Sequence, residues 1–384
     1  MTINSENIKS LIEQGENSSI EFKNASVKPD AIAKEIIAFA NTSGGVILIG
    51  IEDDKSISGI DDSKNWEEWT MNIIRNNIHP PLNIQFNILK IENKKIAVIE
   101  VPKGINKPYQ ALDGNYYIRI GSTNRIASIQ ELMRLFQESG MFHYDMTSVP
   151  GTSVKSLNLN IVSQYFKYYD IDFENQSQGD RVKLLTNTDL LDENGEVTVA
   201  GLLVFGIQPE KYLYQSGITF VHYRGTDLTG ELIDNKHIEG CIDFVISTAL
   251  AAIKNNIKVP ATIVGLKRVD IDVAYSDKVF RELISNCVAH RNYSITGSKI
   301  RIFMFDNRIE FISPGKLPNT ITIEKLSAGV SFRRNQLLTK FLVAFRFIDT
   351  FGRGIPNVIA EVKRRNKSIM FEEIGEEFKV TLFL

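Results

Sequence analysis

Apolar residues in the first 140 positions follow both helical and strand patterns. Between positions 30 and 41 they recur at helical spacing, so that Ile32, Ile36, Ile37 and Ala40 share one face of a predicted helix. The turn residues Thr42-Ser43-Gly44-Gly45 end this helix, and a buried strand is predicted at 46–51. The other elements predicted here are strands at 20–23, 84–89, 95–101 and 116–120 and helices at 8–13 and 128–138. The pattern predicts a compact α+β domain over residues 1–140.

The pattern is weaker from residue 141 to residue 205, and this segment is predicted to be a short connector. A winged-helix fragment is an alternative, but the basic recognition helix that such a module needs is not visible. From residue 206 to residue 384, strand-like and helix-like segments alternate, which favours a layered sheet with helices on one face. The chain is therefore predicted to be an α+β protein with domains at 1–140 and 206–384.

Composition limits the function classes. The 44 basic and 46 acidic residues give a net charge of -2, so nucleic-acid binding must use a local patch. Two cysteines are too few for a disulfide framework or a thiolate metal cluster, which fits a reducing compartment. The polar N-terminus does not resemble a secretory signal, and the longest apolar runs are far shorter than the roughly 20 residues that span a bilayer. We expect a soluble, cytoplasmic protein with no membrane segment.

The chain offers a first candidate site in the predicted helix near residue 285. Glu282, Asn286 and His290 recur at i, i+4 and i+8, so they share one helix face, while apolar residues form the other. An amide oxygen can coordinate a hard cation, and a neighbouring carboxylate can take a proton from an attacking water. Spacing alone slightly favours an ordinary solvated helix face over a phosphate and magnesium site.

Two loops downstream change that balance. A predicted strand at 308–312 ends in Ser313-Pro314-Gly315, which makes a rigid loop at the strand end. The run Gly352-Arg353-Gly354 opens another predicted helix, where glycine lets backbone N–H groups approach phosphates. Either glycine element alone is weak evidence for a nucleotide site.

In this order, these elements resemble the ATPase superfamily of gyrase, histidine kinases, mismatch-repair proteins and a heat-shock chaperone (GHKL), in a divergent version found in bacterial ATP-binding regulators. The resemblance implies a Bergerat-type α/β sandwich that binds ATP with Mg²⁺ or Mn²⁺. In the Glu-x-x-x-Asn motif, Glu282 takes the role of general base and Asn286 that of magnesium ligand. The implied cofactor-binding residues are Glu282, Asn286, His290, Ser313, Gly315, Gly352 and Gly354. Most members carry an aspartate where Ser313 stands, which leaves both adenine selectivity and hydrolysis open.

A second candidate site lies near the N-terminus. Glu16 and Glu21 stand five residues apart, and Glu52-Asp53-Asp54 follows the strand predicted at 46–51. Three converging acids can hold a divalent metal that activates water, as in many nucleases. For any single acid, ordinary solvation at a strand end is at least as good an interpretation.

As a block, residues 12–60 resemble the Schlafen-type domain, also described as AlbA-like or divergent AAA, through Glu-Phe-Lys, Phe-Ala-Asn-Thr-x-Gly-Gly and Gly-Ile-x-Asp. Relatives bind nucleic acids, and some are metal-dependent endoribonucleases acting on tRNA-like substrates. The resemblance implies metal ligands and catalytic acids at Glu16, Glu21 and Asp53, with Glu52 as an alternative for the third. Basic residues that could contact phosphates include Lys23, Arg119 and Arg125, although generic surface charge is their ordinary interpretation.

Together, the resemblances imply an ATP-binding protein that acts on nucleic acid, RNA rather than DNA, and assembles as a homo-oligomer when loaded with nucleotide. The first functional hypothesis is an RNA-cleaving enzyme that acts in anti-phage defence. The alternative is a DNA-binding transcriptional regulator that senses ATP and cuts nothing. A third hypothesis is an ATP-sensing scaffold with neither activity.

Overall fold

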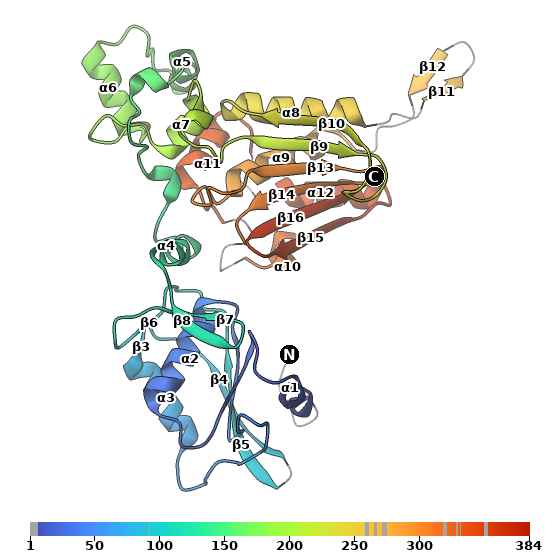
Figure 1. Ribbon diagram of the computed structural model, residues 1–384. Helices are drawn as coiled ribbons and strands as arrows, with labels where there is room; N and C mark the ends of the chain where they lie inside the picture. Colours follow the sequence, from blue (N-terminus) through green and yellow to red (C-terminus); the bar gives the residue numbers. More distant parts are fainter. Residues whose placement is uncertain are drawn as a thin grey trace. The chain divides into compact units, whose positions relative to one another are not determined.

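The computed structural model describes residues 7–91, 93–257, 261–264, 267–270, 275–317, 321–327, 329–330, 332–348 and 352–384. The chain divides into two compact units, Met1–Phe142 and His143–Leu384 (Figure 1). Each unit combines helices with sheet, and no helix in the described ranges is long and apolar enough to cross a membrane. The mixed α+β class predicted from the sequence is confirmed.

A four-stranded sheet forms the centre of the first unit, in the order β1-β2-β5-β4. Strand β1 pairs with β2 in parallel, and the other pairs are antiparallel. Successive residues of a strand point to opposite faces, so Ile47 and Ile99 belong to the core beneath α2 and α3, whereas Leu48 and Val98 belong to the core beneath α1. The elements are α1 (Ile8–Gln14), β1 (Ile20–Lys23), α2 (Pro29–Asn41), β2 (Gly45–Ile49), α3 (Trp66–Asn77), β4 (Gln85–Ile91) and β5 (Lys94–Val101).

Smaller elements complete this unit. The hairpin of β7 (Tyr117–Ile120) and β8 (Thr123–Ile126) packs on α2, and β3 (Ile78–His79) pairs with β6 (Gln110–Ala111). Helix α4 (Ile129–Glu138) begins with a capping box, in which Ser128 and Glu131 each accept a hydrogen bond from the other's backbone N–H.

A buried ion-pair network joins the sheet, α2 and the hairpin. The Arg119 side chain is 1% exposed, and its guanidinium lies 2.7 Å from Glu21 Oε2 and 3.2 Å from Glu35 Oε2. The contact with Glu21 is an ion pair without an aligned hydrogen bond, while Arg119 also donates to the carbonyls of Asn17 and Ile20. Lys23 pairs with both carboxylates. Burial, followed by the charge of Glu21, raises the pKa of Glu35, so the network holds a carboxylate whose ionised form is costly.

The second unit contains a six-stranded sheet in the order β10-β9-β13-β14-β16-β15, in which only β9 and β13 are parallel. Helices α8, α9 and α12 lie along one face of this sheet (Figure 1). Ile300 and Ile302 of β13 are buried on that face, while Arg301 between them is half-buried. The elements are β9 (Ile218–Tyr223), β10 (Leu232–Ile238), α8 (Ile242–Asn256), α9 (Asp277–His290), β13 (Ile300–Met304), β14 (Arg308–Pro314), α12 (Gly354–Arg364), β15 (Ile369–Ile374) and β16 (Glu377–Phe383).

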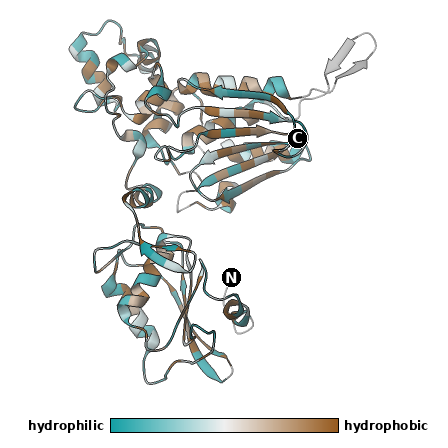
Figure 2. Ribbon diagram, viewed as in Figure 1, coloured by the Kyte–Doolittle hydropathy of each residue, from teal (hydrophilic) through white to brown (hydrophobic). Residues whose placement is uncertain are grey.

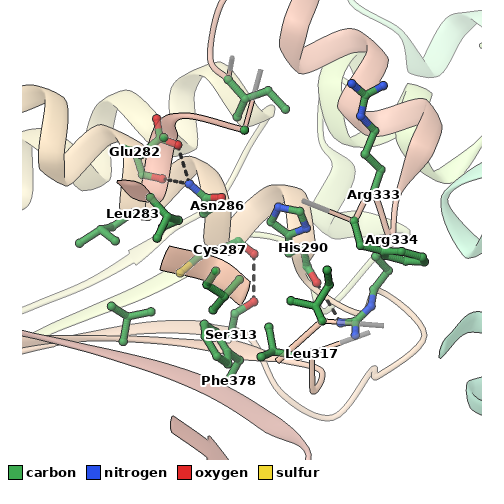
Figure 3. Close-up of a pocket in the computed structure, with 18 of the residues that line it drawn as sticks. Glu282, Leu283, Asn286, Cys287, His290, Ser313, Leu317, Arg333, Arg334 and Phe378 are labelled. Atoms are coloured by element: carbon green, nitrogen blue, oxygen red, sulfur yellow. Dashed lines mark hydrogen bonds between the residues drawn. The ribbon is translucent and has the colours of Figure 1, made fainter. Parts of the chain in front are cut away.

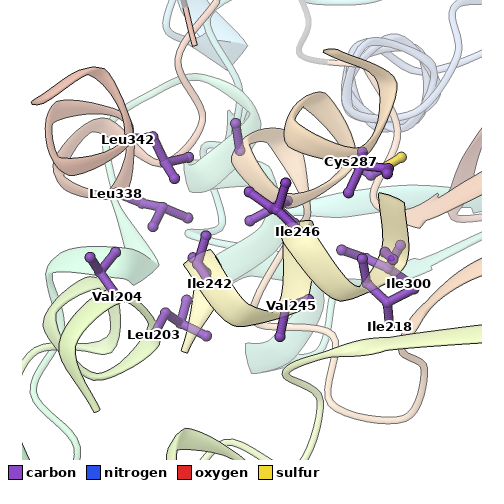
Figure 4. Packing of buried hydrophobic residues seen from close by; sticks show 14 of the residues in the cluster. Leu203, Val204, Ile218, Ile242, Val245, Ile246, Cys287, Ile300, Leu338 and Leu342 are labelled. Atoms are coloured by element: carbon purple, nitrogen blue, oxygen red, sulfur yellow. The ribbon is translucent and has the colours of Figure 1, made fainter. Parts of the chain in front are cut away.

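The segment predicted to be a connector, 141–205, is folded and contributes to the second core. All seven residues of α7 (Val199–Phe205) are buried, and Figure 4 shows Leu203 and Val204 beside Ile242 of α8 and Leu338 of α11 (Gln336–Ala344). A helix that is apolar on every side lacks the periodic pattern by which an amphipathic helix is recognised.

Figure 2 shows that hydrophobic and hydrophilic residues are intermixed along the helices and strands of both units. The remaining elements are η1 (Tyr144–Met146), η2 (Val154–Ser156), α5 (Leu159–Lys167), α6 (Gln178–Asn187), η3 (Pro209–Lys211), β11 (Ala261–Val264), β12 (Lys267–Asp270) and α10 (Ile323–Ser327).

We predict that Arg119→Met lowers the free energy of unfolding of the first unit by about 3 to 5 kcal/mol, because it leaves two buried carboxylates with too little positive charge. Both tryptophans of the chain, Trp66 and Trp69, lie in α3, so their fluorescence in urea reports this unit in the full chain. As a control, Lys95→Met breaks the exposed pair with Asp62 and should cost less than about 1 kcal/mol. Equal losses in the two variants would contradict a stabilising role for the network.

Candidate functional site

A pocket in the second unit lies between α9, the floor of the sheet and the segments before α11 and α12 (Figure 3). It brings together all seven residues predicted to bind a cofactor, from three stretches of the chain more than 20 residues apart. These residues are Glu282, Asn286, His290, Ser313, Gly315, Gly352 and Gly354. The solvated-face interpretation of the α9 motif is therefore not what the structure shows, although the roles of these residues stay predictions.

Helix α9 presents its polar face to the pocket. Residues Leu283, Ile284 and Val288 of the same helix are buried in the second core, which fixes the rotation of the helix. At its start, Ser276 donates hydrogen bonds of 2.9 Å to Glu361 of α12 through both its backbone N–H and its hydroxyl. The two helices that border the pocket are thus tied to each other.

Glu282 and Asn286 form a hydrogen-bonded pair. The Asn286 Nδ2 donates to the Glu282 backbone carbonyl at 2.7 Å and to Glu282 Oε1 at 2.8 Å. Because both bonds use the amide nitrogen, the amide oxygen is the atom that Asn286 can offer to a ligand. This donor set fits Mg²⁺, which commonly takes one or two protein oxygens and completes its octahedron with substrate phosphates and water.

Gly354, the first residue of α12, makes room for the Glu282 carboxylate. A Cβ at position 354 would lie 1.7 Å from Glu282 Oε1, so any other residue would displace this side chain. Gly352 has a φ of 67°, in the left-handed region that favours glycine. From the sequence we expect these glycines to let phosphates approach; in the structure, Gly354 makes room for the Glu282 carboxylate.

The loop after β14 is held by Arg334. Its guanidinium donates to the carbonyl of His290 at 2.9 Å and to the carbonyl of Lys316. Gly315 has a φ of 116°, and a Cβ there would lie 2.1 Å from Arg334 Nη1. Glycine is required at position 315 both by its backbone conformation and by the close approach of the guanidinium.

Asn335 completes the end of α9. Its Nδ2 donates to the carbonyls of Ala289 at 3.0 Å and Arg291 at 2.8 Å. Such carbonyls lack partners within a helix, and here a neighbouring segment satisfies them. This role of Arg334 and Asn335 was not predicted from the sequence. An adjacent Arg-Asn pair carries no periodic pattern that would have indicated it.

His290 is a neutral group in this pocket at pH 7. Burial, followed by the positive charge of Arg334, lowers its pKa to about 4. The imidazole can therefore donate or accept a hydrogen bond but brings no positive charge to a bound anion. Cys287 is neutral as well, because burial raises the pKa of its thiol to about 12.

Ser313 lies on the sheet floor. It is 6% exposed, and its hydroxyl donates to the Cys287 carbonyl at 2.9 Å. Across the strands it pairs with Phe378, which also lines the pocket (Figure 3). Other apolar residues that line the pocket include Leu317, Phe371 and Val380, together with Leu283 of α9.

In the first unit, the three predicted catalytic acids have separate environments. Glu21 is 4% exposed and points toward α2, where it pairs with Arg119 and Lys23. Glu16 is exposed and accepts a 3.0 Å hydrogen bond from the backbone N–H of Phe22. Asp53 is exposed in the turn after β2. Across the described ranges, no three His, Cys, Asp or Glu side chains lie close enough together to hold a metal ion.

The three basic side chains predicted to contact nucleic acid all form ion pairs with glutamates in the structure. Arg119 is buried in the network described above, so a phosphate could reach its guanidinium only if that network opened. Lys23 belongs to the same network. Arg125, by contrast, is 46% exposed in its pair with Glu131, and solvent-exposed pairs cost little to break. Of the three, Arg125 is the residue that the structure leaves accessible.

Comparisons with protein families support the division into two domains. Residues 16–128 match the family described as Schlafen, AlbA_2, and residues 297–382 match the family described as Putative ATP-dependent DNA helicase recG C-terminal. The resemblance of the first domain to Schlafen/AlbA-like proteins and of the second to ATPase-like proteins is thereby confirmed. The second match begins after α9, so it does not include Glu282 or Asn286.

A solved structure supports the fold. The DIP2311 protein from Corynebacterium diphtheriae is 19% identical, covers 98% of this chain and 79% of its own, and superposes with a TM-score of 0.50. The N-terminal domain of a putative ATP-dependent DNA helicase RecG-related protein from Nitrosomonas europaea is 24% identical over 31% of this chain and 92% of its own, with a TM-score of 0.23. A search of curated proteins gives no match.

We predict that the imidazole of His290 titrates with a pKa of about 4 instead of the usual 6.5. The measurement is an NMR titration of the five histidines of the chain, in which the resonance of His290 is identified by its loss in His290→Gln. Because the group stays neutral from pH 6 to pH 8, ligand binding in the pocket should not depend on its protonation there. A midpoint near pH 6.5 would show that solvent reaches the ring freely.

Proposed function

We propose that this protein binds ATP together with a divalent cation in the pocket of the second unit, and that its first unit binds nucleic acid. The observation that carries the proposal is the convergence of Glu282, Asn286 and His290 with two glycine-containing loops in one pocket. The match of the first unit to a Schlafen family supports nucleic acid as its ligand. The match of the second unit to a recG-like ATPase family supports ATP as its ligand.

The lining of the pocket suits the parts of a nucleotide. Apolar side chains on the sheet floor can bury a base, whereas Asn286 and the start of α12 suit charged phosphates. Mg²⁺ or Mn²⁺, held by the Asn286 amide oxygen, would neutralise phosphate charge. Glu282 would then be the group that accepts a proton from an attacking water, in the orientation fixed by Asn286 and Gly354.

For the first unit, we propose binding of nucleic acid, RNA in preference to DNA. The family resemblance also predicts RNA cleavage through Glu16, Glu21 and Asp53. The geometry favours binding over cleavage, because Glu21 already forms buried ion pairs with Arg119 and Lys23. A role in anti-phage defence depends on that cleavage. The alternative of an ATP-sensing, DNA-binding transcriptional regulator needs no catalytic acids.

Nucleotide binding is proposed to control the first unit through assembly of a homo-oligomer. The support for this is the family resemblance. Measuring the mass of the protein in solution with and without Mg·ATP tests it, because an unchanged mass and unchanged nucleic-acid affinity would contradict the coupling.

We predict that Asn286→Ala weakens Mg·ATP binding by about tenfold or more, because it removes both the cation ligand and the hydrogen bond that orients Glu282. Isothermal titration calorimetry with Mg²⁺ and with EDTA measures this, and the loss should be smaller in EDTA, where the cation ligand has no role. The matched control is Asn160→Ala on the exposed face of α5, which should bind like the unmodified protein. Absence of ATP binding by the unmodified protein would contradict the proposed site.

We predict that the protein binds tRNA without cutting it in Mg²⁺ or Mn²⁺. Arg125→Ala should lower the salt dependence of binding by about one phosphate contact, whereas Lys95→Met should not. Cleavage is tested with Glu16→Gln and Asp53→Asn, because both acids are exposed and their replacement leaves the ion-pair network intact. Products formed by the unmodified protein and lost in both variants would establish cleavage and contradict the binding-only proposal. Preferential binding of plasmid DNA would favour the regulator.

A further inference from the structure

A groove in the first unit opens on the face of its sheet that carries α1. In Figure 1, α1 lies on the opposite side of this sheet from α2 and α3. Each strand contributes one residue to a row that crosses the sheet in register, and the whole row lines the groove: Ile20, Val46, Glu100 and Gln85. Glu100 stands two residues from Val98 of the core beneath α1, so it points to that face. The volume of the groove is about 690 Å³, within the range of roughly 300 to 1,000 Å³ found for small-ligand sites.

Glu100 supplies an unsatisfied acceptor to this groove. Its Oε1 is buried, and no hydrogen-bond donor among the described residues reaches it. Its neighbours in the row are the aliphatic Val46 on one strand and Gln85, with an exposed side chain, on the other. A buried carboxylate oxygen without a partner is costly, because it has lost its water and gained no donor. The groove therefore holds an acceptor that a ligand can satisfy.

The polarity of the groove fits a flat, unpaired base. Aliphatic side chains of Leu11, Ile20 and Val46 can cover one face of a ring. The two oxygens of the Glu100 carboxylate accept hydrogen bonds side by side, and the Gln85 amide next to them can donate one. Guanine has the complementary edge, in which the 2-amino group and N1–H are neighbouring donors and O6 is an acceptor. On the corresponding edge of each other RNA base, a single donor is flanked by an acceptor.

We propose that this groove binds an unpaired guanine of single-stranded RNA and that Glu100 recognises the edge of the base. The inference rests on the proposed function, because it concerns the nucleic acid that the first unit binds. An arginine side chain of a partner protein also presents two N–H donors to a carboxylate. It has no acceptor for the Gln85 amide, so guanine satisfies more of the groove.

The base preference of the full chain tests the proposal. Fluorescence anisotropy measures binding to labelled oligouridines that carry guanine, hypoxanthine or adenine at one central position. Guanine should bind at least about tenfold more tightly than the others, because hypoxanthine lacks the 2-amino donor and adenine presents an acceptor to the carboxylate. In Glu100→Gln the preference should fall toward one, since an amide places a donor where an acceptor stood. The matched control is Glu67→Gln at an exposed position of α3, which should keep the preference.

Stability separates a binding role of Glu100 from a structural one. Glu100→Gln removes a carboxylate whose buried oxygen has no partner among the described residues. The urea midpoint of the first unit, followed by the fluorescence of Trp66 and Trp69, should therefore stay unchanged or rise. A lower midpoint would contradict the proposal, because it would show that the carboxylate stabilises the fold.

Failure of this inference differs from failure of the proposed function. Equal affinity for the three oligonucleotides would leave RNA binding in place and overturn the role of Glu100. A guanine preference that persists in Glu100→Gln would overturn it as well, because another group would then recognise the base. An arginine-containing peptide that binds the unmodified protein but not Glu100→Gln would overturn the assignment to guanine. Absence of binding to all three RNAs would contradict the proposed function and this inference together. The comparison of the three RNAs needs no variant, so it stays decisive if Glu100→Gln fails to fold.

Discussion

The carbonyls at the end of α9 have no partners within the helix and need donors from elsewhere in the chain. The pocket of the second unit depends on how this need is met. A helix end leaves backbone acceptors without partners, and burying them unpaired would be costly. Arg334 and Asn335 supply the missing donors to His290, Ala289 and Arg291, from a segment more than 40 residues away. The guanidinium of Arg334 also donates to the loop after β14. One buried side chain therefore holds this loop and the end of α9 at a fixed distance from each other. The polar face of α9 is thereby fixed against the sheet floor.

The first unit uses its charges differently. In the second unit, polar groups line a cavity. In the first unit, by contrast, four charged residues form ion pairs with one another inside the fold: Glu21, Glu35, Lys23 and Arg119. Breaking such a set exposes an uncompensated buried charge, so the network ties the first strand of the sheet to α2 and to the β7–β8 hairpin. Charged residues that a family resemblance assigns to chemistry thus serve the architecture of this unit. Arg125, by contrast, lies outside this network in an exposed pair with Glu131.

Local patterns predicted many of the elements and one face of the site, but not the helices α5 and α7 between residues 141 and 205. The i, i+4, i+8 spacing of Glu282, Asn286 and His290 was enough to place them on one side of a helix, because helical geometry depends only on neighbours in the chain. Strands such as β5 were expected within one residue of their bounds. What could not be predicted depends on contacts distant in sequence. The pairing of Arg119 with Glu35, the clamp by Arg334 and the packing of α7 all require the tertiary fold, and a helix as apolar as α7 gives no periodic pattern to indicate it.

The strand order of the second sheet has a consequence for how the protein is made. β14 is flanked by β13 and β16, and β16 carries Phe378 and Val380 of the pocket floor. During synthesis from the N-terminus, the first unit has all its strands once residue 142 has left the ribosome, whereas the pocket lacks its floor until residues 377–383 have emerged. A nascent chain therefore presents a complete first unit well before the pocket of the second unit can form. Any control that the second unit exerts on the first begins only after translation has passed that last strand.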